Sequence, residues 1–178
     1  MLKKILVTII SGVCIVALNP FVVVDTCSAE ISKSELCLGG VTSQSLRNDV
    51  MRMYGKPTWE SQGGSEWCYG NSVSIVFDEE MVSSVTVTAN NGWATPAGLT
   101  VGMNANTAIN LYGDPDKSVT RDNKTLYVYF VNYLQGGKGH LAIVFDKSSK
   151  KISKLNIKKS HMADFREYYS NWVNSMFN

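Results

Sequence analysis

"RMYGKPT" occupies residues 52–58, and "NLYGDPD" occupies residues 110–116. In both stretches a glycine follows an apolar run that ends in tyrosine, and a proline follows two positions later. Glycine readily takes the left-handed conformation that ends a helix, and the proline prevents the helix from continuing. The two stretches therefore predict two helix ends, and their similarity indicates a duplicated unit.

The residues ahead of each glycine predict a short amphipathic helix. Before Gly113, Asn104 is a candidate N-cap, and apolar residues then recur at helical spacings, at Ala105, Ala108, Ile109 and Tyr112. Before Gly55, Thr42 or Ser43 is the candidate cap, and the apolar stripe consists of Leu46, Val50, Met53 and Tyr54. The lead-in to Gly55 is longer, so we expect the first helix to be about one turn longer.

After each glycine the apolar pattern changes from helical to alternating. The first copy continues with "SEWCYG", "SVSIVFD" and "VSSVTVTA", and the second with "KTLYVYFVNY", "GHLAIVFD" and "KISKLNIKK". Each series predicts an antiparallel three-stranded meander, and both middle strands end in Ile-Val-Phe-Asp, at 75–78 and 143–146. We predict an α+β fold in which two tandem helix-plus-meander repeats form one sheet with the helices on one face.

The chain divides into four segments on this interpretation. Residues 1–29 are typical of a signal peptide, since two lysines precede an apolar run and small residues precede Glu30. A retained membrane anchor is the alternative, and lipidation of an early cysteine is a weaker one. The first repeat covers 30–93 and the second 94–159. Residues 160–178 form an amphipathic helix that packs on the sheet or binds a partner, with its apolar residues at Met162, Phe165, Tyr169, Trp172 and Met176.

Charge and cysteine content restrict the chemistry. The chain of 178 residues has a net charge of +2, which does not require nucleic acid. Lysines crowd residues 147–159, where we expect them to protect an exposed sheet edge. Cys37 and Cys68 remain after the signal peptide, and export favours a disulfide between them. Their spacing from the histidines does not suit zinc, so we expect neither metal nor cofactor.

The order of these features resembles two groups of exported bacterial proteins. "GMNANTAINLYGDP" (102–115) and "VMRMYGKP" (50–57) carry the resemblance, which covers residues 36–158 or thereabouts. One group is the outer-membrane assembly lipoproteins of the small-protein-A type, and the other is the β-lactamase inhibitor protein family, with two such units in tandem. The resemblance implies a non-catalytic binding protein with an exposed concave sheet.

Alternation also assigns faces to the strands. Val73, Ile75 and Phe77, like Leu141, Ile143 and Phe145, are expected to face the helices. The strand around residues 125–133 is apolar on both sides. If Leu126 and Val128 point inward, a row of aromatic residues lies on the open face and forms the predicted partner surface, consisting of Trp67, Tyr69, Tyr127, Tyr129 and Tyr133. The alternative is that these rings only stabilise the sheet.

An enzyme is the least favoured of three functional classes. His140 and His161 lie in no nucleophile–base pattern, and "QGGKG" (135–139) joins two strands instead of opening a helix. We therefore expect no catalytic residues. The favoured function is an exported, secreted or periplasmic, binding module for a protein or a cell-envelope component. A membrane-tethered assembly or scaffold protein is the alternative, and it alone would involve membrane contact.

Overall fold

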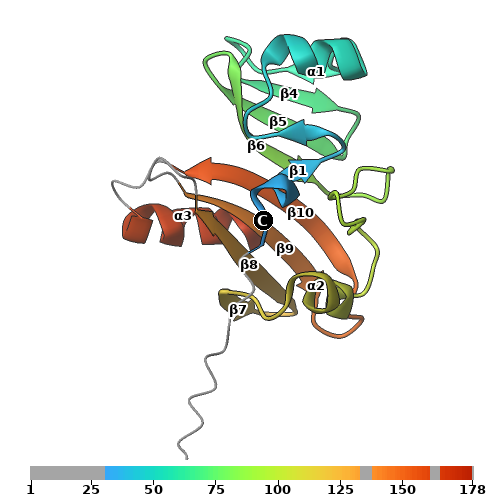
Figure 1. The fold of residues 1–178 in the computed structure, drawn as a ribbon, viewed down its shortest axis with the longest axis vertical. Helices are drawn as coiled ribbons and strands as arrows, with labels where there is room; N and C mark the ends of the chain where they lie inside the picture. The colour runs from blue at the N-terminus through green and yellow to red at the C-terminus, as the bar shows by residue number, and fades with distance from the viewer. Residues whose placement is uncertain (1–30, 133–137, 161–164, 178) are drawn as a thin grey trace, which may run out of the picture.

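The computed structural model describes residues 31–132, 138–160 and 165–177. Within them the protein is a mixed α/β structure with one eight-stranded antiparallel sheet, a two-stranded sheet and three α-helices (Figure 1). A 3₁₀ turn (Lys33–Glu35) is the first described element. The two strands of the small sheet follow, β1 (Cys37–Leu38) and β2 (Val41–Thr42), and then the first helix, α1 (Arg47–Tyr54). In these ranges no helix has both the length and the apolar composition to cross a bilayer.

The eight-stranded sheet consists of two groups of four strands, and each group follows one helix. The first group is β3 (Trp59–Glu60), β4 (Glu66–Tyr69), β5 (Val73–Asp78) and β6 (Met81–Val87). After α2 (Ala105–Tyr112) come β7 (Lys117–Arg121), β8 (Lys124–Asn132), β9 (Lys138–Asp146) and β10 (Ile152–Ser160). Each group thus has one strand more than the meander predicted from the sequence.

The two groups join through their last strands, in the order β3-β4-β5-β6-β10-β9-β8-β7. At this seam Val87 of β6 lies opposite Leu155 of β10, and Ser84 lies opposite Lys158. The lysine-rich strand is therefore central in the sheet, and the prediction that its lysines protect an edge is wrong. The edges are β3 and β7, and β7 itself begins with Lys117 and ends with Arg121.

Both predicted helix ends are confirmed. Gly55 and Gly113 follow the last helical residues with φ of 73° and 76°, a left-handed region that other residues rarely adopt. Asn104 caps α2, because its side chain accepts the backbone N–H of Asn106 at 2.9 Å.

The start and length of the first helix differ from the prediction. Leu46 is its N-cap, and α1 has eight residues, the same number as α2. The extra residues before it form β2 and a turn in which the backbone N–H of Thr42 donates to Ser45 Oγ at 3.0 Å. Serine and threonine compete with helix formation through such local bonds, so the added length extends the lead-in instead of the helix.

The main core lies between the sheet and the two helices α1 and α2. The helices contribute Val50, Ala105, Ala108 and Tyr112. The inward faces predicted for β5, β9 and β10 are confirmed, since their large apolar residues are 5% exposed or less: Val73, Ile75, Phe77, Leu141, Ile143, Phe145, Leu155 and Ile157. This cluster is continuous across the seam and includes residues of both groups of strands.

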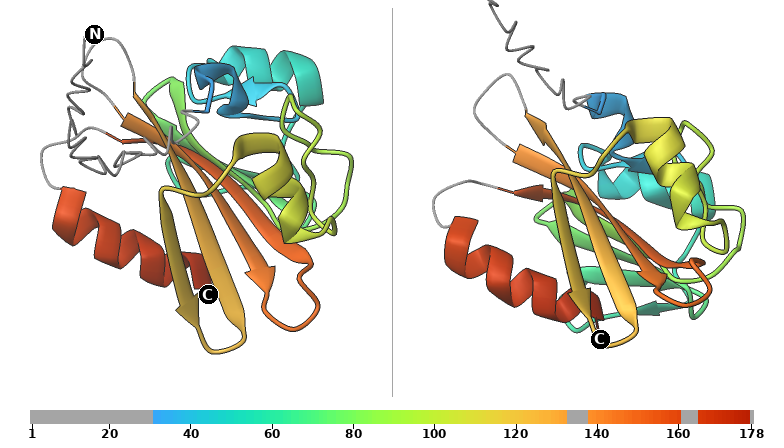
Figure 2. Two further views of the ribbon diagram at one scale, coloured as in Figure 1. Left: turned by 60° about the horizontal axis from the view of Figure 1, so that its bottom comes forward. Right: turned by 90° about the horizontal axis from the view of Figure 1, so that it is seen from below.

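The third helix, α3 (Phe165–Phe177), lies on the opposite side of the sheet from α1 and α2 (Figure 2). Its Trp172, Val173 and Met176 form a second apolar cluster with residues of β8 and β9: Leu126, Val128, Ala142 and Val144. Two lysines fix the end of the helix, because Lys124 Nζ donates to the Phe177 carbonyl and Lys154 Nζ to the Met176 carbonyl, at 3.2 and 3.1 Å. Cations stabilise a helix C-terminus in this way. The helix therefore packs on the sheet, which is the first of the two alternatives given for it in the sequence analysis.

The predicted orientation of β8 is wrong. Leu126 and Val128 face α3, whereas Tyr127, Tyr129 and Val131 belong to the core under α1 and α2. The strand is buried on both sides, so its apolar residues do not alternate with polar ones. Without alternation, the sequence of this strand gives no indication of which residues face which layer.

Candidate binding surface

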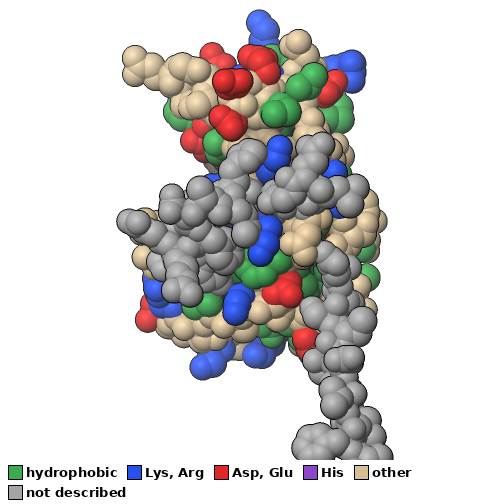
Figure 3. All heavy atoms as spheres, turned by 60° about the vertical axis from the view of Figure 1, so that its left-hand side comes forward, with side chains coloured by type: hydrophobic (Ala, Val, Ile, Leu, Met, Phe, Trp, Pro, Cys, Tyr) green, Lys and Arg blue, Asp and Glu red, His purple; other side chains and the backbone are tan. Residues whose placement is uncertain are grey.

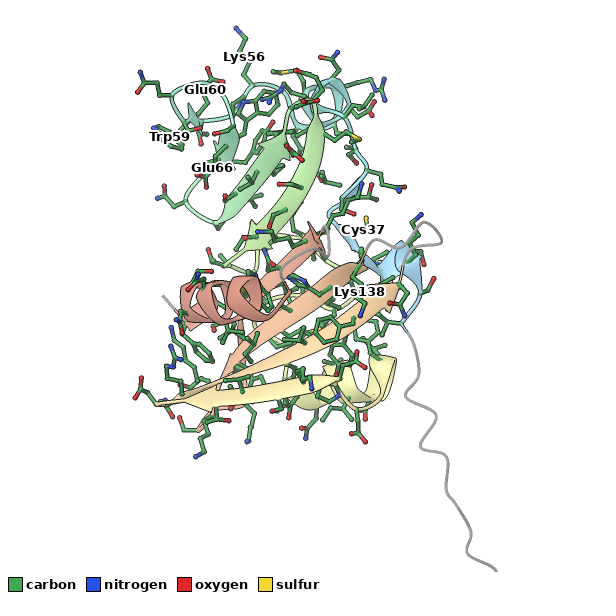
Figure 4. All side chains as sticks on the ribbon, turned by 90° about the vertical axis from the view of Figure 1, so that its left-hand side faces the viewer. Cys37, Lys56, Trp59, Glu60, Glu66 and Lys138 are labelled. Atoms are coloured by element: carbon green, nitrogen blue, oxygen red, sulfur yellow. The ribbon has the colours of Figure 1, made fainter. Side chains whose placement is uncertain are left out.

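Among the described residues, no helix covers one half of one sheet face. We call it the open half-face: the side of β4, β5 and β6 that points away from α1, consisting of Glu66, Cys68, Ser74, Val76, Ser84 and Thr86. The corresponding side of β8 and β9 lies under α3, as described above. Val76 is 36% exposed on the open half-face, whereas its neighbours on the same strand, Ile75 and Phe77, are at most 5% exposed. Figure 4 shows this side of the molecule, with α3 across the lower half of the sheet and Glu66 and Trp59 on the upper half.

A hollow of about 420 Å³ lies at one end of the open half-face. Its volume falls in the range of small-molecule sites, roughly 300–1,000 Å³. Trp59 forms one wall from the edge strand β3, directly opposite Cys68, and 54% of this tryptophan is exposed. The lining carries no charged side chain, and its polar groups are Cys68, Asn71, Ser72, Ser74, Thr86 and Thr88.

The hydroxyl groups of the hollow have fixed hydrogen-bonding directions. Asn156 Nδ2 donates to Thr86 Oγ1 at 2.9 Å, and Asn91 Nδ2 donates to Ser72 Oγ at 3.0 Å. Because these two oxygens already accept a bond, their O–H groups remain to donate. Ser74 Oγ donates to the carboxylate of Glu66, so its lone pairs remain to accept. The lining therefore presents donors at Ser72 and Thr86 and an acceptor at Ser74, which lies directly opposite Thr86.

Asn156 connects this surface to the seam of the sheet. It lies on β10 opposite Thr86 and is 3% exposed. Its Nδ2 is also within hydrogen-bonding distance of Ser84 Oγ and of the Val85 carbonyl, at 2.9 and 3.2 Å, so its two N–H groups are shared among three oxygens. The second group of strands thus positions hydroxyl groups of the first. Buried amides with several bonds of this kind orient their partners rigidly.

The structure shows no disulfide between Cys37 and Cys68, so the predicted bridge stays a prediction. Cys37 and Cys68 are both free thiols. Cys68 lines the hollow on the open half-face. Cys37 lies in β1, two residues before Gly39, and the Gly39 carbonyl accepts a hydrogen bond from Tyr54 of α1. The sheet thus separates the two thiols. Desolvation by burial raises the pKa of both, which keeps them protonated at neutral pH.

The predicted aromatic surface faces the wrong side of the sheet. Trp67 and Tyr129 are 4% and 1% exposed, and Tyr69 and Tyr127 are half-buried against the core under α1 and α2. In β4 the residues that face away from α1 are instead Glu66 and Cys68, and in β8 they are Leu126 and Val128. Tyr133 and His161 lie outside the described residues.

These four rings form the same two contacts in each half. Tyr69 donates its hydroxyl to the Gly55 carbonyl at 2.9 Å, and Tyr129 donates to the Gly113 carbonyl at 3.0 Å, so each tyrosine holds the glycine that ends its helix. The other ring of each strand packs edge-on against the phenylalanine of Ile-Val-Phe-Asp, as Trp67–Phe77 and Tyr127–Phe145 at 4.8 and 4.7 Å between ring centroids. Their observed contacts are those of structural residues.

His140 is buried under α3 and is not part of the hollow. It is 3% exposed, its ring centroid lies 4.1 Å from that of Trp172, and its Nε2 has no hydrogen-bond partner among the described residues. Burial, together with the nearby Lys158, lowers the pKa of His140 to about 3. A neutral imidazole enclosed in this way cannot exchange protons with a ligand on the surface.

Charge is divided unevenly between the halves. Residues 31–93 contain seven acidic and four basic side chains, whereas residues 94–160 contain four acidic and ten basic ones. Figure 3 shows acidic side chains gathered on the half that contains α1 and β3–β6, and lysines and arginines on the other half. The uncharged hollow therefore lies in the acidic half, so its neutrality is a local property.

The sequence indicated part of this surface. The prediction that Val73, Ile75 and Phe77 face the helices implies that Ser72 and Ser74, which alternate with them, lie on the opposite face. The sequence did not indicate Trp59, since β3 has only two residues and shows no period. The pairing of Trp59 with Cys68 is what brings the indole to the hollow.

These features describe a mixed α/β protein in which α1 and α2 lie on one face of the sheet and α3 covers part of the other, among the described residues. No protein-family model, curated protein or solved structure matches the chain. Among the described residues, no three histidine, cysteine or acidic side chains gather as a metal site.

Proposed function

We propose that this chain is an exported, non-catalytic binding protein that recognises a protein or a cell-envelope component through the open half-face. The observation that carries the proposal is the difference between the two halves of one sheet face. In the second half α3 covers the face, whereas in the first half no described element covers Val76 and the hydroxyl groups beside it. A partner that fits there would complete the cover.

Export is the part of the proposal that rests on sequence alone. Residues 1–29 have the charged start, the apolar run and the small residues of a signal peptide, and they lie outside the described residues. The mass of the protein recovered from its native host tests this point. A chain that starts at Glu30 supports export, and a full-length or lipidated chain supports the tethered alternative.

We further propose that the fold arose by duplication of a helix-plus-meander unit, with boundaries near residues 93 and 159. Each half follows the order helix, glycine, four antiparallel strands, and each uses a tyrosine hydroxyl to hold the glycine carbonyl. The equivalent Phe77 and Phe145 contacts support the same interpretation. These likenesses agree with the resemblance to the tandem β-lactamase inhibitor proteins, which remains an expectation.

Surface variants test the binding proposal. Val76→Arg adds a long charged side chain at the centre of the open half-face, and Thr120→Arg adds the same side chain to the exposed edge strand β7 in the other half. Sedimentation of the purified residues 30–178 with cell-envelope and soluble fractions of the producing organism gives the readout. We expect Val76→Arg to abolish binding and Thr120→Arg to preserve it. Equal binding by both variants would contradict the proposed surface.

A further inference from the structure

We propose that the hollow bounded by Trp59 and Thr86 binds a neutral carbohydrate. The proposal rests on the proposed function, since it names the ligand class for one end of the open half-face. Three properties of the lining carry it: the absence of charge, the arrangement of donors and acceptors, and the exposed indole.

The lining favours an uncharged ligand. None of its side chains is charged, and burial raises the pKa of Cys68, so the thiol also stays neutral. The carboxylate of Glu66 lies outside the lining and accepts the Ser74 hydroxyl. An anionic ligand would find no cation among the lining side chains and a cationic ligand no carboxylate, and burying an unpaired charge is costly.

The hydrogen-bonding pattern suits a ligand that both donates and accepts. Ser72 and Thr86 present O–H donors because Asn91 and Asn156 supply the bonds that their oxygens accept. Ser74, directly opposite Thr86, presents an acceptor. Sugar hydroxyl groups are donors and acceptors at once, so adjacent hydroxyls of one ring can satisfy both kinds of group. A purely apolar ligand would leave these hydroxyls without partners, which costs binding free energy.

The indole of Trp59 supplies the apolar part of the site. It is 54% exposed on an edge strand, opposite Cys68, and forms a wall of the hollow. A pyranose ring has a flat face of C–H groups besides its hydroxyls, so it can lie against an aromatic ring while its edges bond to the floor. An apolar wall with a few oriented polar groups is the usual composition of a small-ligand site.

The fluorescence of Trp59 allows a direct test on the purified residues 30–178. The other three tryptophans, Trp67, Trp93 and Trp172, are at most 8% exposed, so acrylamide should quench Trp59 preferentially. The probes are neutral trisaccharides of glucose, mannose and N-acetylglucosamine, each titrated to about 10 mM, where even weak sites fill. We expect at least one of them to protect Trp59 from quenching in a saturable manner.

Variants then show whether binding occurs in the hollow. We expect Trp59→Ala and Thr86→Val each to weaken the trisaccharide affinity about tenfold, measured by calorimetry, the size of one good contact. Thr120→Val is the matched control, since it removes an exposed threonine hydroxyl from β7 in the other half, and it should bind as the unaltered protein does. Thr86→Val conserves shape, and circular dichroism confirms its fold.

The outcomes separate this inference from the proposed function. If no trisaccharide binds at about 10 mM, or if Trp59→Ala and Thr86→Val bind as tightly as Thr120→Val, the carbohydrate proposal is wrong. If Val76→Arg still removes an envelope or protein partner in that case, the open half-face keeps its proposed role. If sugars bind and Val76→Arg affects no partner, the hollow is the binding site and the wider surface is not.

Discussion

The two halves of the sheet solve one packing problem differently. Both have a helix on one side, α1 for β3–β6 and α2 for β7–β10. On the other side, the second half presents Leu126, Val128, Ala142 and Val144 to α3, whereas the first half presents serine, threonine and a single exposed valine. Burial of apolar surface stabilises by roughly 25 cal/mol per Å². The apolar residues of the second half therefore need a cover, and the polar residues of the first half do not.

In each half, the polarity of the outer sheet face agrees with its surroundings: the face under α3 is apolar, and the face without a helix is mostly polar. The outer face of the first half is mostly polar, so leaving it in contact with water costs little free energy. Its exposure is therefore a property of the sequence, and this is why we place the partner surface there. The predictions below test the comparison, beginning with the largest expected effect.

Loss of Tyr129 from the core between the sheet and α2 should destabilise the protein strongly. Tyr129→Ser removes a ring that is 1% exposed and a hydroxyl that holds Gly113. We expect the free energy of unfolding to fall by about 3–5 kcal/mol in urea denaturation, the range for large aromatic deletions in cores. Tyr69→Ser, at the half-buried equivalent in the first half, should cost less.

A matched substitution separates packing from hydrogen bonding at this position. Tyr129→Phe keeps the ring and removes only the bond to the Gly113 carbonyl, for an expected loss of about 1 kcal/mol. If Tyr129→Ser leaves the urea midpoint unchanged, the ring faces solvent, and the orientation of β8 described here is wrong.

The cover provided by α3 should be separable from the rest of the fold. Trp172→Ala removes the largest side chain of the cluster between α3 and the sheet, and we expect a loss of about 3 kcal/mol. Partial exposure of β8 and β9 should increase binding of an apolar dye. Trp59→Ala is the matched control in the open half and should change stability by less than about 0.5 kcal/mol.

Acid should loosen the covered half through His140. Its pKa in the folded protein is about 3, below the unfolded value of about 6.5, because burial disfavours the charged ring. The unfolded chain therefore binds a proton that the folded chain does not. The stabilisation is fully present above about pH 6.5 and is lost towards pH 3, by up to about 1.4 kcal/mol per pH unit.

The variant His140→Phe isolates this contribution. Phenylalanine keeps the contact with Trp172 and has no titrating nitrogen, so the decline in stability on acidification should be less steep than in the unaltered protein. Urea denaturation at several pH values gives both slopes. Identical slopes would mean that His140 is protonated equally in the folded and unfolded chains.

The smallest expected effect is that of a reductant. Because Cys37 and Cys68 are separated by the sheet, dithiothreitol should leave the melting temperature of residues 30–178 unchanged. Both thiols should also react with iodoacetamide after unfolding without prior reduction. A mass that increases by two hydrogens on reduction would instead establish the bridge predicted from the cysteine count.

The sequence predicted features that depend on local chemistry. Gly55 and Gly113 end helices because backbone sterics decide the matter within a few residues, and Ile75 and Phe77 face the core because polar neighbours alternate with them. The sequence did not predict the direction of β8, where both faces are apolar, or the separation of the two cysteines. Those features depend on residues distant in the sequence: α3 in one case and the pairing of strands in the other.

The seam between β6 and β10 also has a consequence for how the chain is made. Val87 finds its partner Leu155 only after the 67 residues between them have been synthesised. Until then β6 is an unpaired edge, on which another strand can add. Contacts between residues so distant in sequence slow folding. The first half therefore presents β6 as an additional unpaired edge until β10 has been synthesised.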